Sequence, residues 1–402
     1  MREVKPLKRS IVHKIDPLVR SMVKVSNNVN DSVRVILYAK EYERCRPTLE
    51  QLGVTVSAEL PLIDGYVVEM PYRQLARIAG QKNVRYITAD LDVQAQMNVA
   101  KKVVRAEELQ QEGITGKGIG IAFIDTGIYP HPDFTMPKNR IAAFVDIVNS
   151  RSASYDDNGH GTFVAGVAAG NGSASSGMYR GIAPNASIIA IKAMDNNGGG
   201  RASDVLTAMQ WISNNASRYN IRVVSMSLGS AVGTSKRDDA MERGVEQLWR
   251  QGITIVAAAG NSGPESRTIT VPGTSPMVIT VGSNDDKRTI GLEDDTIAEF
   301  SSRGPVSNRA KPDVVAPGVN IRSALADTGY LPGRKMIRMS NYYTTMDGTS
   351  VSTPIVAGLA ALFYEQDPSL TPDDVKRRLI TTAKPLGYSR FAQGYGVAQA
   401  KP

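Results

Sequence analysis

The chain has 402 residues, enough for one large domain and a smaller one, each with its own core. Its composition, 42% hydrophobic and 21% charged, is globular, and no apolar run reaches the roughly 18 residues needed to span a bilayer. The net charge of +8 is dispersed along the chain, which argues against the concentrated basic face of a nucleic-acid-binding protein. We therefore expect neither a membrane nor a nucleic acid as partner.

The cysteine content and the first residues of the chain are the features that indicate a cellular compartment. Cys45 is the only cysteine, so no disulfide can form within the chain. The first ten residues are basic and lack the apolar segment of a secretory signal peptide. If Met1 is the natural start, we expect a cytoplasmic protein. A secreted protein from which the signal had been trimmed would start in the same way.

The first hundred residues alternate between strand and helix patterns. Strands are predicted at 33–38, 54–56, 66–70 and 84–87, and helices at 41–52 and 72–79. This βαββαβ order predicts a small α+β domain of the split βαβ, ferredoxin-like type. Residues 1–30 are basic and weakly patterned, and they form either an extra helix or a mobile extension.

From Gly118 onward, short apolar strands alternate with helices. Strands are predicted at 119–124, 188–191, 223–227, 253–257 and 278–281, and helices at 202–216 and 236–251. This alternation predicts an α/β fold in which helices flank both faces of a parallel β-sheet. Asp125, Ser227 and Asn261 follow strands, so we expect them at the carboxyl edge of the sheet, where ligands bind.

Three short segments place a chemically active side chain next to a buried element. Asp125 ends a buried strand, where an unpaired carboxylate would be costly, so we expect it to have a partner. His160 and Ser350 each precede a run of small apolar residues typical of a buried helix, at 164–170 and 354–363. Ser350 could simply cap its helix, since serine is a favoured N-cap residue. The alternative is a nucleophilic Ser350 with a histidine base and an orienting carboxylate.

Several sequence motifs follow one another in a fixed order. The chain contains Asp-Thr-Gly at 125–127, His-Gly-Thr at 160–162 and Gly-Thr-Ser at 348–350, together with Ser-Leu-Gly at 227–229, Ala-Ala-Gly-Asn at 258–261 and the segments 300–305 and 311–318. Over roughly residues 100–400 the chain resembles the subtilisin-like serine peptidases, in which the triad residues follow in the order Asp, His, Ser. Without a secretory signal, it resembles the intracellular bacterial branch of that family.

The resemblance implies a self-processing pro-enzyme. Residues 1–97 would form an N-terminal extension and an inhibitory pro-domain that acts as an intramolecular inhibitor, and residues 98–402 a subtilisin-like catalytic domain. An unrelated accessory domain is the alternative for the first part. Met97 suits an apolar primary pocket, so we expect self-cleavage near the Met97–Asn98 bond. The substrates implied are polypeptides, and no cofactor is required.

The resemblance also implies roles for individual residues. Ser350 would attack the substrate carbonyl, His160 would transfer protons, and Asp125 would fix the imidazole tautomer. Asn261 would donate a hydrogen bond to the oxyanion. The edges that pair with an extended substrate and the lining of the primary pocket are implied for Gly198, Gly199, Gly200, Ser227, Leu228, Gly229, Ala258 and Gly260. For the three glycines, a flexible turn is an equally good interpretation.

The chain departs from the family pattern in ways that bear on metal binding. The loop at 171–179 contains no Asp or Glu, and calcium sites favour carboxylate ligands, which argues against the usual strong calcium site of the family. Asp133 could still contribute to a weaker structural calcium site. His131 is expected to be structural. Residues 327–346 form a segment longer than its family counterpart, and its sequence indicates no role.

Two other functions fit part of the sequence. A second Asp-Thr-Gly, at Asp327, suggests an aspartic peptidase, in which two carboxylates share a proton. The residues around it do not repeat the strand pattern around Asp125, which argues against a paired site. A non-catalytic protein that keeps this fold is the other alternative. The presence of a complete triad together with Asn261 argues against it.

Overall fold

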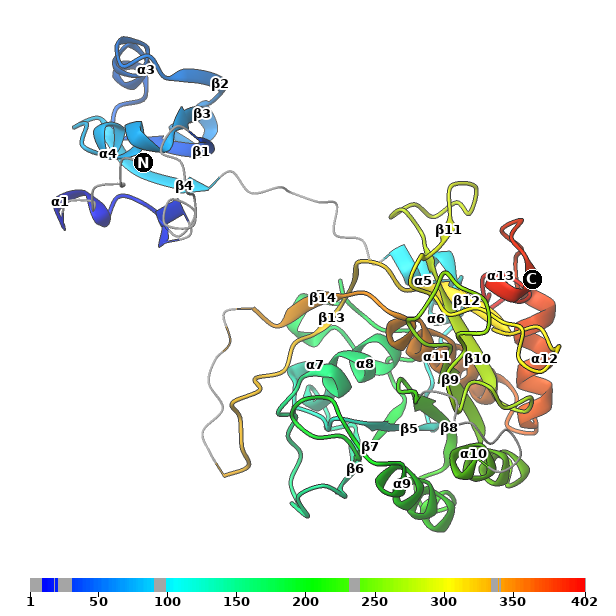
Figure 1. Cartoon of the computed structure of the whole chain (residues 1–402). Helices are drawn as coiled ribbons and strands as arrows, with labels where there is room; N and C mark the ends of the chain where they lie inside the picture. The colour runs from blue at the N-terminus through cyan, green and yellow to red at the C-terminus, as the bar shows by residue number, and fades with distance from the viewer. Residues whose placement is uncertain are drawn as a thin grey trace. The chain divides into compact units, whose positions relative to one another are not determined.

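The structure is a computed structural model that describes residues 9–17, 19–20, 31–89, 99–230, 239–333, 339 and 341–401. The chain divides into two compact units, Met1–Ala95 and Gln96–Pro402, which are described separately (Figure 1). The boundary and cleavage site expected from the sequence, at residue 97, lie outside the described residues. None of the described helices is long and apolar enough to cross a membrane.

The first unit contains a four-stranded antiparallel sheet in the order β2-β3-β1-β4. Its elements are α1 (Arg9–Val12), β1 (Ser32–Ala39), α3 (Tyr42–Gln51), β2 (Thr55–Leu60), the 3-10 turn η1 (Pro61–Ile63), β3 (Gly65–Pro71), α4 (Tyr72–Ala79) and β4 (Val84–Ala89). Val35 and Leu37, alternate residues of β1, are fully buried and share one core with Leu49 of α3 and Ile78 of α4. From β1 to β4, the element order is the predicted βαββαβ.

The second unit is built on an eight-stranded sheet in the order β11-β10-β9-β8-β5-β7-β6, with β12 also paired to β10. The strands are β5 (Gly120–Asp125), β6 (Ile141–Asp146), β7 (Ser187–Lys192), β8 (Ile221–Met226), β9 (Thr254–Ala258), β10 (Ile279–Asp285), β11 (Thr296–Ile297) and β12 (Val314–Pro317). Their pairings are parallel except that of β10 with β11. Every residue of β5 and β9 is buried, as expected for strands covered on both faces.

Helices cover both faces of this sheet, which confirms the predicted α/β fold class (Figure 1). α8 (His160–Ala169) and α11 (Thr349–Gln366) lie on one face and pack against each other, while α9 (Ala202–Asn215) and α10 (Ala240–Arg250) lie on the other. The shorter helices are α5 (Val99–Val103), α6 (Ala106–Gln111), α7 (Pro132–Thr135), the 3-10 turn η2 (Ser173–Ser175), α12 (Pro372–Thr382) and α13 (Arg390–Gln393). A Cβ atom at Gly358 of α11 would lie 2.5 Å from Cβ of Ile182, so this close packing requires glycine.

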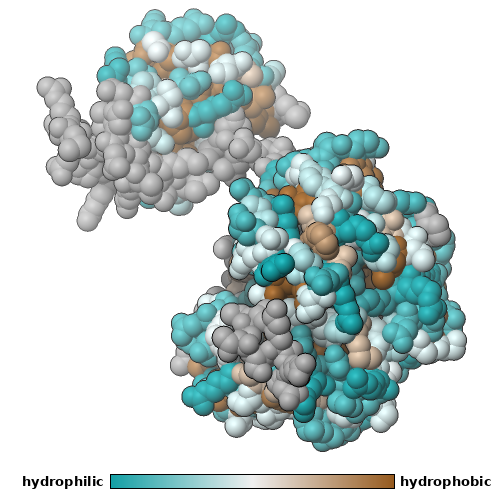
Figure 2. Space-filling model, turned by 45° about the vertical axis from the view of Figure 1, so that its right-hand side comes forward, coloured by the Kyte–Doolittle hydropathy of each residue, from teal (hydrophilic) through white to brown (hydrophobic). Residues whose placement is uncertain are grey.

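Some elements of the second unit differ from the sequence predictions. The edge strand β6 was not predicted, although its residues 141–145 form a continuous apolar run; most of its residues are only partly buried. A two-stranded hairpin, β13 (Ile321–Ala324) and β14 (Tyr343–Met346), flanks residues 325–342. α10 begins at Ala240 rather than at 236, and residues 231–238 lie outside the described part. On the face shown in Figure 2, hydrophobic residues of this unit form small patches among hydrophilic ones.

Candidate active site

Asp125 and His160 form a direct pair at the carboxyl edge of the sheet. Asp125 ends β5 and is 2% exposed, and its Oδ1 accepts hydrogen bonds from His160 Nδ1 at 2.8 Å and from the backbone N–H of Thr126 at 2.7 Å. The buried carboxylate therefore has the partner that its position required. With Nδ1 donating to Asp125, Nε2 of the neutral ring is left as the acceptor, which is the tautomer that a general base needs.

His160 is the first residue of α8, and its side chain remains 25% exposed. Gly159 precedes it with φ of +103°, a left-handed conformation that favours glycine and turns the chain into the helix. Burial of the ring lowers the pKa of His160, but the charge of Asp125, the hydrogen bond to it and the charge of Asp156 outweigh that effect. The pKa therefore lies above its ordinary value.

Asp156 is fully buried and organises the start of α8. Its Oδ1 accepts from Thr126 Oγ1 at 2.8 Å and from the backbone N–H of Gly159 at 2.8 Å. Its Oδ2 accepts from the backbone N–H and the hydroxyl of Thr162, at 2.8 and 2.6 Å. A carboxylate is favourable at a helix N-terminus. Because Thr126 and Gly159 are the direct neighbours of the paired residues, Asp156 ties their two loops together, a role that the sequence did not indicate.

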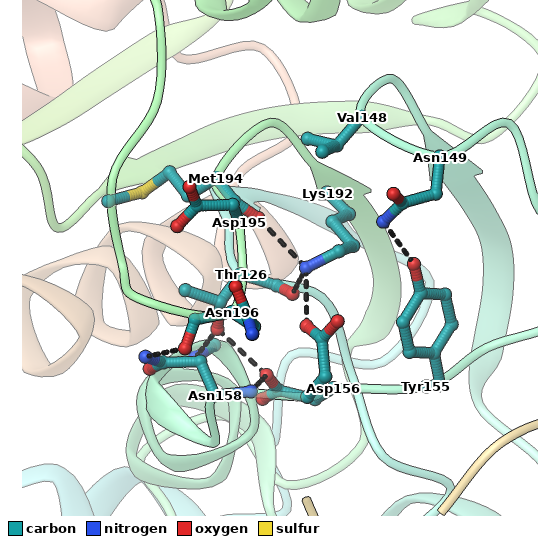
Figure 3. A network of polar contacts seen from close by, with 12 residues as sticks. Thr126, Val148, Asn149, Tyr155, Asp156, Asn158, Lys192, Met194, Asp195 and Asn196 are labelled. Carbon is teal, nitrogen blue, oxygen red and sulfur yellow. Dashed lines mark hydrogen bonds and ion pairs between the residues drawn. The ribbon is translucent and has the colours of Figure 1, made fainter.

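Lys192 also contacts both the loop after Asp125 and the loop before His160 (Figure 3). It ends β7 directly opposite Asp125 in the parallel register, and its side chain is fully buried. Its ammonium donates to the backbone carbonyls of Thr126 at 2.7 Å and Met194 at 2.8 Å, and to the carboxylate of Asp157 at 2.7 Å. All three donors of the ammonium are thus used. The only signal in the sequence was a lysine that closes an apolar strand, and it was missed.

Ser350 and Asn261 meet at the N-terminus of α11. Oδ1 of Asn261 accepts from the backbone N–H and the hydroxyl of Thr349, each at 2.9 Å, which leaves the Nδ2 donors of the amide free of that contact. Gly348 has φ of +143°, and a Cβ atom there would lie 3.0 Å from Ser350 Oγ and 3.3 Å from Asn261 Nδ2. Glycine therefore keeps open a space that borders both the hydroxyl and the amide.

The hydroxyl of Ser350 has no hydrogen-bond partner among the described residues. In enzymes without bound substrate, hydrogen bonds between reacting groups are often long and tighten only when substrate binds. Ser227, which follows β8, donates from its hydroxyl to the backbone carbonyl of Ser350 at 2.7 Å. Ser227 therefore holds the backbone of Ser350 as well as belonging to a predicted substrate edge.

The three glycines at 198–200 lie in and just after a tight turn. Asp195 donates its backbone N–H to the carbonyl of Gly199 at 2.7 Å, and its Oδ1 accepts from the backbone N–H of Asn197 and Gly199. Gly198 has φ of +78°, which favours glycine. Gly199 and Gly200 are exposed. The turn interpretation thus holds for Gly198, while the next two residues remain accessible to a ligand.

The remaining predicted substrate residues lie at the ends of β8 and β9. Leu228 is half-buried and Gly229 is exposed, and a Cβ atom on Gly229 would overlap the side chain of Thr270. Ala258 is 4% exposed. Gly260 has φ of +107° and donates its backbone N–H to Thr349 Oγ1 at 3.2 Å. The carboxyl ends of β8 and β9 therefore place both segments near the start of α11, which carries Ser350.

Asp133 is engaged by donors rather than arranged as a cation ligand. It is 1% exposed, and the Tyr343 hydroxyl lies 2.9 Å from both of its carboxylate oxygens. Its Oδ1 also accepts from the backbone N–H of Ala174 at 2.9 Å. The fully buried His131 accepts the backbone N–H of Asp133 on Nδ1, and burial lowers the pKa of His131. Within the described ranges, no group of three or more His, Cys, Asp or Glu side chains could hold a metal. The residues at Asp133 therefore do not fit a calcium ion.

Asp327, in the second Asp-Thr-Gly, does not pair with Asp125. Its Oδ1 accepts from the backbone N–H of Gly329 at 3.1 Å and closes a turn of its own. Asp125 is instead engaged by His160. The shared-proton site of an aspartic peptidase is therefore not formed.

Comparison with known proteins agrees with this geometry. A profile described as the subtilase family matches residues 116–397. Serine protease AprX of Bacillus subtilis (strain 168) is 45% identical over 310 residues, which cover 74% of this chain and 69% of that protein. The thermostable alkaline protease of Halalkalibacterium halodurans is 33% identical over 345 residues, covering 85% of this chain and 82% of the relative.

Solved structures give the same result. The S41 psychrophilic protease is similar with a TM-score of 0.60 and 31% identity, over 71% of this chain and 92% of the other. Sphericase is similar with a TM-score of 0.59 and 29% identity, over 71% and 92% of the two chains. The chain therefore belongs to the subtilase family and is a subtilisin-like serine protease.

Proposed function

We propose that the protein is a serine endopeptidase whose triad is Asp125, His160 and Ser350. The observation that carries this proposal is the 2.8 Å hydrogen bond from His160 Nδ1 to the buried Asp125. The second support is the position of Ser350 at the start of α11, beside the amide of Asn261. Among the described residues, the other pair of a histidine and a carboxylate, His131 with Asp133, is fully buried, whereas the side chain of His160 remains 25% exposed.

The proposed reaction gives each of these residues one role. Nε2 of His160 takes the proton of the Ser350 hydroxyl as its oxygen attacks the substrate carbonyl carbon, while Asp125 holds the tautomer and stabilises the imidazolium. The oxyanion of the tetrahedral intermediate receives hydrogen bonds from Asn261 Nδ2 and from the backbone N–H of Ser350. His160 then gives its proton to the leaving amine. Water hydrolyses the acyl-enzyme by the same steps in reverse order.

We further propose that the substrate is an extended polypeptide. The exposed backbone of Gly199 and Gly200 on one side, and of Leu228 and Gly229 on the other, offers edges with which a substrate strand can pair. Pairing of this kind reads the backbone and tolerates many sequences. The buried end of β9 at Ala258 suits an apolar side chain before the scissile bond.

The first unit is proposed to be the inhibitory pro-domain, cut by Ser350 near the Met97–Asn98 bond. The support is the separate compact unit Met1–Ala95, with a core of its own, placed before the catalytic unit. In this arrangement the chain that follows β4 would reach the substrate groove and be the first substrate.

The test is the mass of the purified chain and its peptidase activity. The parent protein is expected to be cut within about three residues of Met97, whereas Ser350→Ala stays full length and inactive. Ser203→Ala, at an exposed serine at the start of α9, serves as the control and is expected to be cut like the parent. Cleavage of the Ser350→Ala chain at the same bond would overturn self-processing. Peptidase activity in that variant would overturn the triad.

A further inference from the structure

The longer segment after β13 lies against the loop that carries the catalytic histidine. A Cβ atom at Gly159 would lie 3.6 Å from Cγ2 of Thr328 and 3.8 Å from Cβ of Ala326. The ring of Tyr330 meets the ring of Tyr129 edge-on, with centroids 5.4 Å apart. Residues 326–330 are therefore anchored directly beside His160.

An open groove continues outward from this contact. It has a volume of about 470 Å³ and is lined by Ser150, Arg151, Ser152, Ala153, Leu331 and Pro332. One wall thus belongs to the segment after β13, and the other to the loop after β6 that leads to His160. In Figure 1 the segment after β13 runs down past α7 and α8 toward this loop.

The turn at 195–200 and the segment after β13 contact adjacent residues of the loop that precedes His160. The turn contacts Asn158, whose Nδ2 donates to the carbonyl of Asn196 at 3.1 Å and lies 3.5 Å from a Cβ position on Gly198. The segment after β13 contacts the next residue, Gly159. If the turn holds the acyl part of the substrate, the leaving amine must lie at His160, which protonates it. The chain beyond the scissile bond then continues toward the groove.

Arg151 is the one charged side chain among the described residues that line the groove. Arg151 is exposed, and its guanidinium lies over the ring of Tyr155, 4.9 Å from the centroid. No carboxylate within the described residues forms an ion pair with Arg151. The nearby carboxylates are otherwise engaged, because Asp146 accepts from the Tyr155 hydroxyl and Asp157 from Lys192. Leu331 and Pro332 supply an apolar wall opposite.

We propose that this groove is a subsite for substrate residues that follow the scissile bond, and that Arg151 selects an acidic side chain there. The inference rests on the proposed function, since it places the leaving part of the peptide at His160. The favoured substrates would then be polypeptides with Asp or Glu within the first few residues after the cleaved bond.

The test uses internally quenched peptides that are identical up to the scissile bond and carry either Glu or Lys after it. In the parent, kcat/KM for the Glu peptide should exceed that for the Lys peptide by up to about fivefold, the size expected for one partly exposed ion pair. The preference should shrink at high salt, because exposed charges are screened. Arg151→Glu should reverse it. Arg201→Glu carries the same charge change at an exposed residue before α9 and should keep the parent preference.

A chromogenic substrate that ends at the scissile bond separates this proposal from the proposed function. Each variant's rates on the peptides are divided by its own rate on that substrate, so a folding defect cancels. Hydrolysis of the chromogenic substrate that survives in Ser350→Ala would overturn the triad. Normal hydrolysis with equal Glu-to-Lys ratios in the parent and in Arg151→Glu would overturn the subsite alone.

Discussion

Replacing Tyr343 with phenylalanine is expected to destabilise the second unit, because it removes the hydroxyl that satisfies the buried carboxylate of Asp133. The Tyr343 hydroxyl lies 2.9 Å from both oxygens of Asp133, and no other donor reaches Oδ2 of Asp133 among the described residues. Burial raises the pKa of Tyr343, so its hydroxyl remains a donor. Oδ1 of Asp133 would keep the backbone N–H of Ala174, at 2.9 Å.

The size of the effect follows from the charge and burial of Asp133. A hydrogen bond to a charged group contributes about 1.5–3 kcal/mol, and leaving such a group unsatisfied costs at least as much. For a unit of roughly 300 residues, the unfolding entropy is on the order of 0.6 kcal/mol per kelvin. The melting temperature should therefore fall by about 2–5 °C.

Thermal unfolding in the Ser350→Ala background, where self-digestion cannot occur, provides the assay. Tyr342→Phe is the matched control, since it removes the same atom from the neighbouring residue, whose backbone carbonyl, not its hydroxyl, contacts His131. We expect the control to change the melting temperature by less than half as much. A rise in melting temperature on adding calcium that disappears in Asp133→Asn would refute the reasoning, because it would show that this carboxylate binds a cation.

Three further outcomes follow from the site and its surroundings. Asn261→Ala should lower kcat by about 10²–10³ with little change in KM, a magnitude taken from the corresponding asparagine of subtilisin; a kcat within about threefold of the parent would exclude the oxyanion role. The acid limb of kcat/KM should have its midpoint above about pH 6.5, because His160 must be neutral to act and its pKa is raised; a maximum below pH 5 would contradict this. Burial and the charges of Asp286 and Asp294 raise the pKa of Asp295 to about 7, so ionisation costs more in the folded state and stability is lost as pH rises toward 7. Asp295→Asn should therefore stabilise the protein more at pH 8 than at pH 5, as measured by denaturant unfolding, and an equal effect at both would contradict the assignment.

The fold and the pairing of Asp125 with His160 could be predicted because their signals are local. Asp125 ends an apolar strand and His160 starts a run of small residues, so each could be identified from the residues next to it in the sequence. Parallel strands buried on both faces also give continuous apolar runs, which β5 and β9 show. The edge strand β6 was missed although residues 141–145 also form a continuous apolar run, so that signal was present in the sequence and was overlooked.

The supporting polar contacts could not be predicted, because they join residues far apart in the chain. Lys192 reaches Thr126 across 66 positions, and Tyr343 reaches Asp133 across 210. Asp133 could be identified as a carboxylate near a loop, but nothing in the sequence says which donor faces it. A calcium ion and a tyrosine hydroxyl both satisfy a buried carboxylate, and only the structure distinguishes them.

Buried charges explain how the site stays ordered. Asp156 and Lys192 are both fully buried, and each contacts the loop after Asp125 and the loop before His160 from a different side. A buried charge is tolerated only with its partners in place, so displacing either loop by a few ångströms would leave a carboxylate or an ammonium unsatisfied. Such a displacement would cost several kcal/mol, far more than the difference between two rotamers of a surface loop. The 2.8 Å contact between His160 and Asp125 is thus held by the buried neighbours Asp156 and Lys192, so the imidazole is already oriented without a ligand.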